Sequence, residues 1–277
     1  LMSIITLITD FGYKDHFVGQ LKGNIYSNNP HVNIVDISHE ISPFNIMEAA
    51  YILENSYKNF PNETVHIIDV DSERTEEKKY IIMHLDNHYF IASDNGILSI
   101  LSQNINPEKI FEIIINEDLN TIDSSIKIFS EVSSHLAKGG KPEIVGKQIN
   151  GIKSVKNLKP FINEDLKQIV SSVIYVDNFG NVVTNLKKDF FEEIRKGRKF
   201  IISARNYKFD KIYNKYSDIV NLKTDITERN DEGKGMVLFN SSDLLQISIY
   251  KSNPKNVGTA SSLMGLKIYD SVTVTFD

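Results

Sequence analysis

Three acidic residues stand at the ends of apolar runs in the first third of the sequence. Asp10, Asp36 and Asp71 each close a stretch rich in Ile and Val, which is typical of a buried β-strand. In open α/β sheets, ligands bind beyond the carboxyl ends of the strands, so the three carboxylates are candidates for ligand binding. Each Asp taken alone also fits a simpler role as the cap of the following helix or turn.

A second candidate site lies in the second half of the chain, at residues 177–185. This segment, DNFGNVVTN, combines polar side chains with one aromatic ring between two β-rich runs. A turn of this kind offers hydrogen-bonding groups and a stacking face. A tight β-turn without a ligand is the alternative that the string alone leaves open.

The sequence offers little that would hold a metal ion. Residues 69–73, DVDSE, carry oxygen atoms that a hard cation could use, but the glycine and the distal glutamate of a calcium loop are missing. We interpret this segment as a solvated turn. The seven histidines lack ligand spacing, and His135 falls in an apolar helical stretch where a buried structural role is expected. We therefore expect no metal site.

The first half of the chain alternates between strand and helix patterns. Strand-like runs cover residues 4–9, 32–35 and 64–70. Between them, apolar residues recur at helical spacing, first from Phe17 and then behind a capping box that starts at Asn45. This rhythm predicts an α/β fold class, with an N-terminal α/β domain built on a mostly parallel sheet.

After about residue 160 the pattern changes to short strands separated by turn residues. Only residues 188–195 form a clear helical pattern there, which is typical of a small, mostly antiparallel β-barrel-like domain. The polar segment 141–166 is interpreted as the connector. We therefore expect an N-terminal α/β domain over residues 1–160 and a C-terminal β domain over residues 161–277.

Composition limits the remaining functions. With 31 Lys and Arg against 36 Asp and Glu, the net charge is −5. This argues against a nucleic-acid partner, because proteins that bind nucleic acids present a basic surface. The absence of cysteine excludes disulfides, thiolate metal sites and a cysteine nucleophile. No apolar run reaches the roughly 20 residues of a membrane span, and no signal-peptide pattern opens the chain. We expect a cytoplasmic protein without a membrane partner.

Many short strings follow one another in an order that resembles a known family. In the first half they are TDFG at 9–12, FVG at 17–19, IVDISH at 34–39, FP at 60–61, TVH at 64–66, DNG at 94–96 and HLA at 135–137. In the second half they are VD at 176–177, FGN at 179–181, TN at 184–185, NS at 240–241 and GL at 265–266. The sequence resembles the S-adenosylmethionine hydroxide adenosyltransferases, which are adenosine-forming hydrolases related to the fluorinase and chlorinase.

This resemblance implies a substrate and an assembly. The substrate would be S-adenosyl-L-methionine, a small molecule, with no further cofactor. The family pattern also implies a homotrimer whose sites lie between subunits. By position, Asp10 would hold the ribose hydroxyls, which suits a carboxylate accepting two hydrogen bonds. Phe44 would form an aromatic wall against the substrate.

The resemblance also implies substrate contacts in the second half of the chain. Asp177, Phe179 and Asn181 fall at positions that contact the methionine amine and the adenine. Ser241 and Ser242 fall where the amino-acid end of the substrate is held. These assignments rest on the family pattern alone.

The catalytic positions are where this sequence departs from the family. The family string VVDPGVG, followed by an Arg, is shortened here to Asp71 and, three residues later, Arg74. Counting back from His135, Ser124 stands where the family has a His and Ser125 stands where it has the next Gly. The implied reaction is attack of water on the 5′ carbon of the ribose, with Asp71 orienting and deprotonating the water. Arg74 and the two serine hydroxyls would position that water.

Loss of the family histidine leaves two alternatives open. One is a catalytically impaired protein that binds S-adenosylmethionine or adenosine without turnover. The other is halide-dependent adenosyl transfer, since Ser125 stands near the halide position of the related halogenases, although their aromatic string is missing. We expect hydrolysis to adenosine and L-methionine, slowed by about 10²-fold or more, the usual contribution of a general base.

Overall fold

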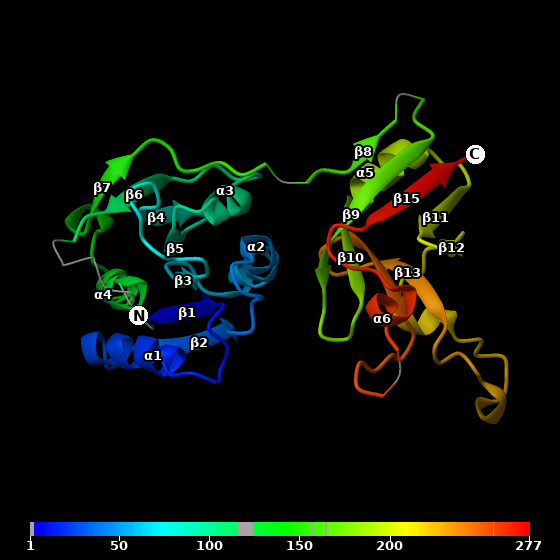
Figure 1. Cartoon of the computed structure of the whole chain (residues 1–277), viewed down its shortest axis with the longest axis horizontal. Coiled ribbons are helices and arrows are strands. Elements are labelled where there is room, and N and C mark those ends of the chain that lie inside the picture. The colour runs from blue at the N-terminus through cyan, green and yellow to red at the C-terminus, as the bar shows by residue number, and fades with distance from the viewer. Residues whose placement is uncertain (1–2, 116–123, 157, 164, 257) are drawn as a thin grey trace. The chain divides into compact units, whose positions relative to one another are not determined.

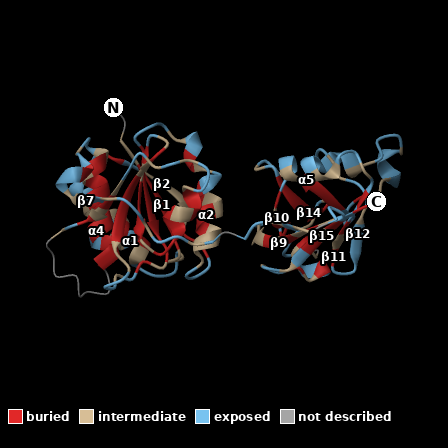
Figure 2. Cartoon of the chain, turned by 90° about the horizontal axis from the view of Figure 1, so that it is seen from above, coloured by how far each residue is buried: buried red, intermediate tan, exposed pale blue. Residues whose placement is uncertain are grey.

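The computed structural model describes residues 3–115, 124–156, 158–163, 165–256 and 258–277. The chain forms two compact units, Leu1–Asn157 and Leu158–Asp277 (Figure 1). Figure 2 shows that buried residues gather inside each unit, so each unit has a hydrophobic core of its own. No helix in these ranges is long and apolar enough to cross a membrane.

A seven-stranded sheet forms the centre of the first unit, in the order β2-β1-β3-β5-β4-β6-β7. Its strands are β1 (Ile4–Thr9), β2 (Asn33–Ser38), β3 (Val65–Asp69), β4 (Tyr80–Leu85), β5 (His88–Ser93), β6 (Lys109–Ile113) and β7 (Gly146–Ile149). The pairs β2–β1, β1–β3 and β3–β5 are parallel, and the pairs from β5 to β7 are antiparallel. Only β4 and β7 therefore run against the other described strands, and the sheet is mostly parallel.

Helices cover both faces of this sheet (Figure 1). α1 (Phe17–Asn28) and α4 (Ser124–Ala137) share one core with Leu7, and α2 (Ile46–Glu54) and α3 (Ile97–Leu101) share the other with Ile8. Neighbouring strand residues point to opposite faces, which explains why consecutive apolar residues of β1 enter different cores. Asn45 caps α2 as expected, because its side chain accepts a hydrogen bond from the Glu48 N–H at 3.1 Å. The reciprocal half of the expected capping box is absent among the described residues, since the Asn45 N–H donates to the Ser42 carbonyl.

The second unit is an antiparallel sheet in the order β12-β11-β15-β9-β10-β14-β13, with β8 beside β9. Its strands are β8 (Phe161–Ile162), β9 (Gln168–Val176), β10 (Val182–Lys187), β11 (Phe200–Ala204), β12 (Tyr207–Phe209), β13 (Gly235–Phe239), β14 (Leu244–Ile249) and β15 (Ser271–Phe276). Its helices are α5 (Lys188–Arg195) and α6 (Ala260–Met264). Short 3₁₀ turns lie at Tyr57–Asn59 and Pro142–Ile144 in the first unit and at Tyr216–Ile219 and Ile226–Glu228 in the second. One core serves strands from both ends of the sheet, which curls into a nearly closed barrel. The predicted α/β fold class is confirmed.

Two expectations about elements were wrong. The segment interpreted as a polar connector contains β7, which pairs with β6 at the sheet edge. Lys147 and Gln148 of β7 are exposed, so an edge strand lacks the apolar density that reveals central strands. The helix expected from residue 129 is already present from residue 124, because its first turn buries serines that an apolar pattern does not detect.

Candidate active site at the carboxyl ends of β1 and β3

Asp10 follows β1 and joins three segments of the first unit. Its Oδ2 accepts a hydrogen bond from the Phe44 N–H at 2.8 Å and a longer one from the Asp71 N–H at 3.4 Å. Among the described residues both bonds use Oδ2, so Oδ1 is the oxygen available to a ligand. The structure thus brings together three positions that the sequence analysis selected.

Phe44 has a conformation that a bulky residue rarely adopts. Its φ is 64°, in the left-handed region, and its side chain is 74% exposed. The hydrogen bond from its N–H to Asp10 fixes the backbone there. Strained residues persist where the surroundings hold them and cluster at ligand sites, which agrees with an aromatic wall at this position.

Asp71 also has a positive φ, 49°, and its carboxylate forms an ion pair with Lys78. The Oδ1–Nζ distance is 3.0 Å, and the backbone carbonyl of Asp71 accepts a hydrogen bond from Asn95 at 3.2 Å. The Asp71 side chain remains one-third exposed. Lys78 lies in no motif and could not be selected from the sequence, whereas Asn95 belongs to the DNG string, a signal that could have pointed to it.

Tyr80 connects the loop after β3 to α4. Its hydroxyl donates to the Ser72 carbonyl at 3.0 Å and lies 2.9 Å from Ser124 Oγ. Because a phenol has one proton, Ser124 is the donor in the second bond. The Arg74 guanidinium lies 5.6 Å from the centroid of the Tyr80 ring, a cation–π contact. Arg74 and Ser124 therefore meet at one side chain that the sequence analysis did not select.

Replacing Tyr80 by Phe is expected to lower the free energy of unfolding by about 1–3 kcal/mol. The variant leaves the Ser72 carbonyl and the Ser124 hydroxyl without their buried partner. Urea unfolding followed by far-UV circular dichroism measures the change. Tyr89→Phe is the matched control, since no described residue hydrogen-bonds its hydroxyl; an equal loss in both variants would contradict the prediction.

Asp69 ends β3 and is buried, with only 1% of its surface exposed. Burial raises the pKa of Asp69 to about 7; the hydroxyls of Ser72 and Ser125 oppose the rise by hydrogen bonding, and the charge of Asp10 adds to it. Its Oδ2 has no hydrogen-bond partner within the described ranges. The interpretation of residues 69–73 as a solvated turn was wrong for Asp69 and for Ser72, which is also buried.

Asp36, the third strand-end acid, belongs to a separate network. Its carboxylate lies 2.6 Å from Lys22 Nζ and 3.1 Å from Nε2 of the buried His39. Burial alone would raise the pKa of Asp36, but the hydrogen bonds and charges of these two partners lower it. These contacts give Asp36 a structural role.

His135 has a structural role but is only half-buried. Its Nε2 lies 3.0 Å from the Lys141 carbonyl, close to the end of α4. The expectation of a core histidine was therefore wrong in burial, because the ring turns toward the chain that follows the helix.

In the second unit, Asp177 organises the turn between β9 and β10. Its Oδ1 accepts the N–H groups of Phe179 and Asn181, both at 2.9 Å, and its Oδ2 accepts the Asn181 side-chain amide at 2.8 Å. Gly180, with φ of 72°, presses against Thr259, where a Cβ would collide. The turn holds the Phe179 ring outward and 62% exposed, as a stacking face requires.

Ser241 and Ser242 lie in the turn between β13 and β14, away from this aromatic ring. Val182 pairs with Ile247 and Lys187 pairs with Leu244, so the two turns lie at opposite ends of β10 and β14. The separation along the strands is roughly 15 Å. The structure does not bring the two expected groups of substrate contacts together within this unit.

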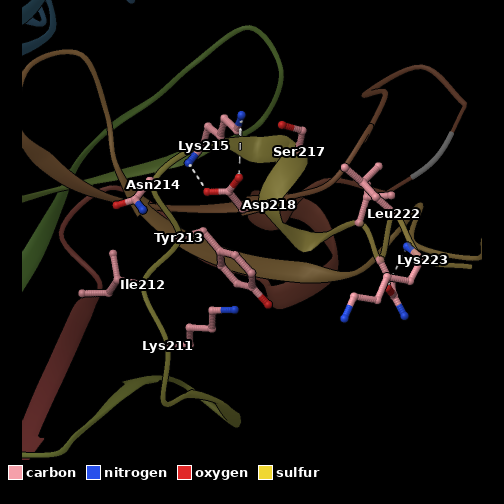
Figure 3. Close-up of a pocket in the computed structure, with 11 residues that line it drawn as sticks. Lys211, Ile212, Tyr213, Asn214, Lys215, Ser217, Asp218, Leu222 and Lys223 are labelled. Carbon is pink, nitrogen blue, oxygen red and sulfur yellow. Dashed lines mark hydrogen bonds and ion pairs between the residues drawn. The ribbon is translucent and has the colours of Figure 1, made fainter.

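A hollow of about 520 Å³ lies elsewhere in the second unit (Figure 3). Lys211, Tyr213 and Lys223 line it, together with Asp218, whose carboxylate accepts the Lys215 N–H at 3.2 Å. None of the expected site residues lines this hollow. In the described part of the chain, no group of three His, Asp or Glu side chains could hold a metal ion.

The fold is that of a two-unit protein with a cluster of polar groups, centred on Asp10, at the edge of an α/β sheet. Residues 5–146 match the SAM hydroxide adenosyltransferase N-terminal domain, and residues 171–273 match the C-terminal domain of the same family. The chain belongs to the SAM hydroxide adenosyltransferase family, and the resemblance stated from the sequence is confirmed.

Named relatives and solved structures agree with this membership. The chain is 28% identical to an (R)-S-adenosyl-L-methionine hydrolase of Methanocaldococcus jannaschii over 100% of this chain and 97% of the relative. It is 25% identical to a fluorinase of Nocardia brasiliensis over 70% of this chain and 74% of the relative. The crystal structure of an uncharacterised conserved protein from Thermotoga maritima superimposes with a TM-score of 0.81 at 28% identity, covering 98% and 99% of the two chains.

Proposed function

We propose that this protein hydrolyses S-adenosyl-L-methionine to adenosine and L-methionine. The observation that carries the proposal is the family match over both units, combined with a strand-end site formed by Asp10, Phe44 and Asp71. Relatives named (R)-S-adenosyl-L-methionine hydrolase from Methanocaldococcus jannaschii and Salinispora tropica support it.

Water attacks the 5′ carbon of the ribose, and methionine leaves as a neutral thioether. Asp10 accepts the ribose hydroxyls through Oδ1, because its Oδ2 already binds two backbone N–H groups. The ring of Phe44 packs against the substrate. The protein must hold the water opposite the sulfur, since in-line alignment supplies much of the rate acceleration.

Asp71 orients the attacking water. Its ion pair with Lys78, at 3.0 Å, fixes the carboxylate. Arg74, Ser124 and Ser125 complete this side of the site; Arg74 and Ser124 are joined through Tyr80. A dry site favours the reaction, because the attack of a hydroxide-like oxygen on a sulfonium neutralises charge.

The second unit contributes the adenine and methionine contacts, from Asp177, Phe179 and Asn181 at one turn and from Ser241 and Ser242 at the other. A homotrimer with sites shared between subunits accounts for the exposed Phe179 and Phe44 rings, which a single chain leaves uncovered. Light scattering tests the assembly: the expected mass is three times 31.5 kDa. A monomer would contradict shared sites.

The reaction is tested by incubating the purified protein with S-adenosylmethionine in ¹⁸O-labelled water. Chromatography with mass detection should show methionine and adenosine carrying ¹⁸O on its 5′ oxygen. Asp71→Asn should lower the rate at least about 10²-fold, because the attacking water loses the carboxylate that orients it. Asp189→Asn, an exposed acid on α5, is the control and should leave the rate unchanged.

The same experiment separates the alternatives. Binding of S-adenosylmethionine without product would identify an impaired binding protein. A 5′-halogenated adenosine formed only when halide is present would identify adenosyl transfer to halide. Unlabelled adenosine, or a rate unaffected by Asp71→Asn, would contradict the proposed mechanism.

Replacing Phe44 by Ala is expected to weaken substrate binding about tenfold, because aromatic stacking contributes about 0.5–1.5 kcal/mol. The measurement is the dissociation constant of S-adenosylmethionine by calorimetry. Tyr269→Ala is the matched control, since Tyr269 is also an exposed aromatic residue, at 64%, with a positive φ of 72°. Similar weakening by both variants would contradict a wall at Phe44.

A further inference from the structure

Asp69 is a buried carboxyl group that the proposed mechanism leaves without a role. Its Oδ2 has no hydrogen-bond partner among the described residues, and only 1% of the residue is exposed. A buried polar group without its full set of partners destabilises the fold, so such groups are rare outside functional sites.

Strand geometry places Asp69 beneath the start of α4 as the structure describes it. Val65 and Ile67 of β3 belong to the core that contains α4, and alternation along the strand turns Asp69 to the same face. There the nearby hydroxyls of Ser125 and Ser72 favour the charged form of the carboxyl group, which lowers its pKa against the effect of burial. Ser125 is buried, with 8% of its surface exposed, in the first described turn of α4.

Among the charged and titratable groups that the structure describes, no cation forms an ion pair or hydrogen bond with Asp69. Asp10, at the end of β1, repels its charge. The hydroxyl of Tyr80, on β4, is already bonded to Ser72 and Ser124, and Arg74 lies over the Tyr80 ring.

The neighbouring Asp71 differs in this respect. Its carboxylate is ion-paired with Lys78 at 3.0 Å and its side chain is one-third exposed, so Asp71 has the cationic partner that Asp69 lacks in the described part of the chain. A general base is most effective when its pKa lies near the working pH, and burial raises the pKa of Asp69 to about 7. The two carboxylates therefore suit different tasks: orientation of the water for Asp71 and proton acceptance for Asp69.

We propose that Asp69 accepts the proton of the attacking water through the hydroxyl of Ser125, in place of the family histidine. As the water oxygen bonds to the 5′ carbon and the carbon–sulfur bond breaks, the water proton passes to Ser125 Oγ. The Ser125 hydroxyl proton passes at the same time to the Asp69 carboxylate, and methionine leaves with the sulfur electron pair. Asp69 returns its proton to solvent after product release. It is a positioning residue, and this role rests on the proposed hydrolase function.

The pH profile of kcat tests this role. In the unsubstituted protein, kcat should rise about tenfold per pH unit below about pH 7 and level off above it. Asp69→Asn should lower kcat about 10²-fold or more and remove this dependence, while the dissociation constant of S-adenosylmethionine changes less than about threefold. Ser125→Ala should remove the same dependence, and Ser125→Thr, which keeps the hydroxyl, should restore part of the rate.

The outcomes separate the two proposals. An unsubstituted protein that forms no adenosine overturns the hydrolase function and this role with it. An active protein whose pH profile persists in Asp69→Asn or in Ser125→Ala overturns the proton path alone. Infrared difference spectra of the carboxyl stretch provide a readout that does not depend on turnover: a carboxyl group titrating near pH 7 should vanish in Asp69→Asn, and its persistence there contradicts the assignment.

Discussion

Asp69→Asn is expected to raise the free energy of unfolding at pH 8 by up to about 4 kcal/mol. The pKa of Asp69 is about 7 in the folded protein and 3.8 in an unfolded chain, and each unit of difference is worth about 1.4 kcal/mol. Between these values the folded protein holds a proton that the unfolded chain has released, so stability falls as the pH rises from 4 to 7. Asparagine carries no charge and avoids this loss.

The substitution preserves the shape of the side chain and the acceptor for Ser72 and Ser125. Urea unfolding at pH 4, 6 and 8, followed by circular dichroism, should show that the gain over the unsubstituted protein grows with pH and is smallest at pH 4. Asp189→Asn, exposed on α5, should show no such trend. A gain that does not grow with pH would contradict the assignment of the raised pKa to Asp69.

A variant that is more stable and less active would locate the trade-off between stability and activity at one carboxyl group. Burying a carboxylate destabilises the fold, and the fold tolerates it where a raised pKa serves the reaction. The neighbouring Asp71 does not show this conflict, because Lys78 neutralises it at the surface.

Local patterns predicted most of the architecture. β1 and α5 have the residue bounds that their apolar periodicity indicated, and the Asn45 cap begins α2 as its sequence signature requires. The approach of Asp10 to the Asp71 segment also followed from strand ends meeting at one sheet edge, whereas Phe44 was placed by the family pattern. These features depend on the spacing of apolar residues and on the direction of the chain, and both can be recognised in the sequence itself.

The parts that could not be predicted depend on contacts distant in sequence. Serines line the buried face of α4, and a polar residue type gives no sign that a helix packs closely on a sheet. The burial of Asp69, the ion pair of Asp71 with Lys78 and the bridge formed by Tyr80 arise only when β3, β4 and α4 meet. Ser241 and Ser242 were placed by the family pattern, and the strand register alone shows their distance from Asp177.

His66 should produce the opposite pH dependence in the same unit. It is fully buried on β3, with Nδ1 2.6 Å from Thr6 Oγ1, Nε2 3.1 Å from His88 Nδ1 and its ring stacked on Phe90. Burial, aided by the nearby His88, lowers the pKa of His66 from 6.5 to about 3. Below pH 6.5, His66 therefore binds a proton in the unfolded chain, whereas in the folded protein it stays neutral down to about pH 3. Stability should fall by about 1.4 kcal/mol per pH unit in that range, or roughly 3.5 kcal/mol from pH 6.5 to 4.

Between pH 4 and 6.5, His66 makes the free energy of unfolding rise with pH and Asp69 makes it fall. The two effects therefore partly cancel in the unsubstituted protein. Asp69→Asn should unmask an acid-induced loss of stability, and His66→Gln should unmask a loss on raising the pH. Burial also lowers the pKa values of His39 and His88. Both residues are present in every variant, so their contribution cancels when a variant's free energy of unfolding is compared with that of the unsubstituted protein. The His66→Gln difference should thus become more favourable by roughly 3.5 kcal/mol as the pH falls from 6.5 to 4. A difference that stays constant with pH would show that His66 titrates alike in the folded and unfolded chains.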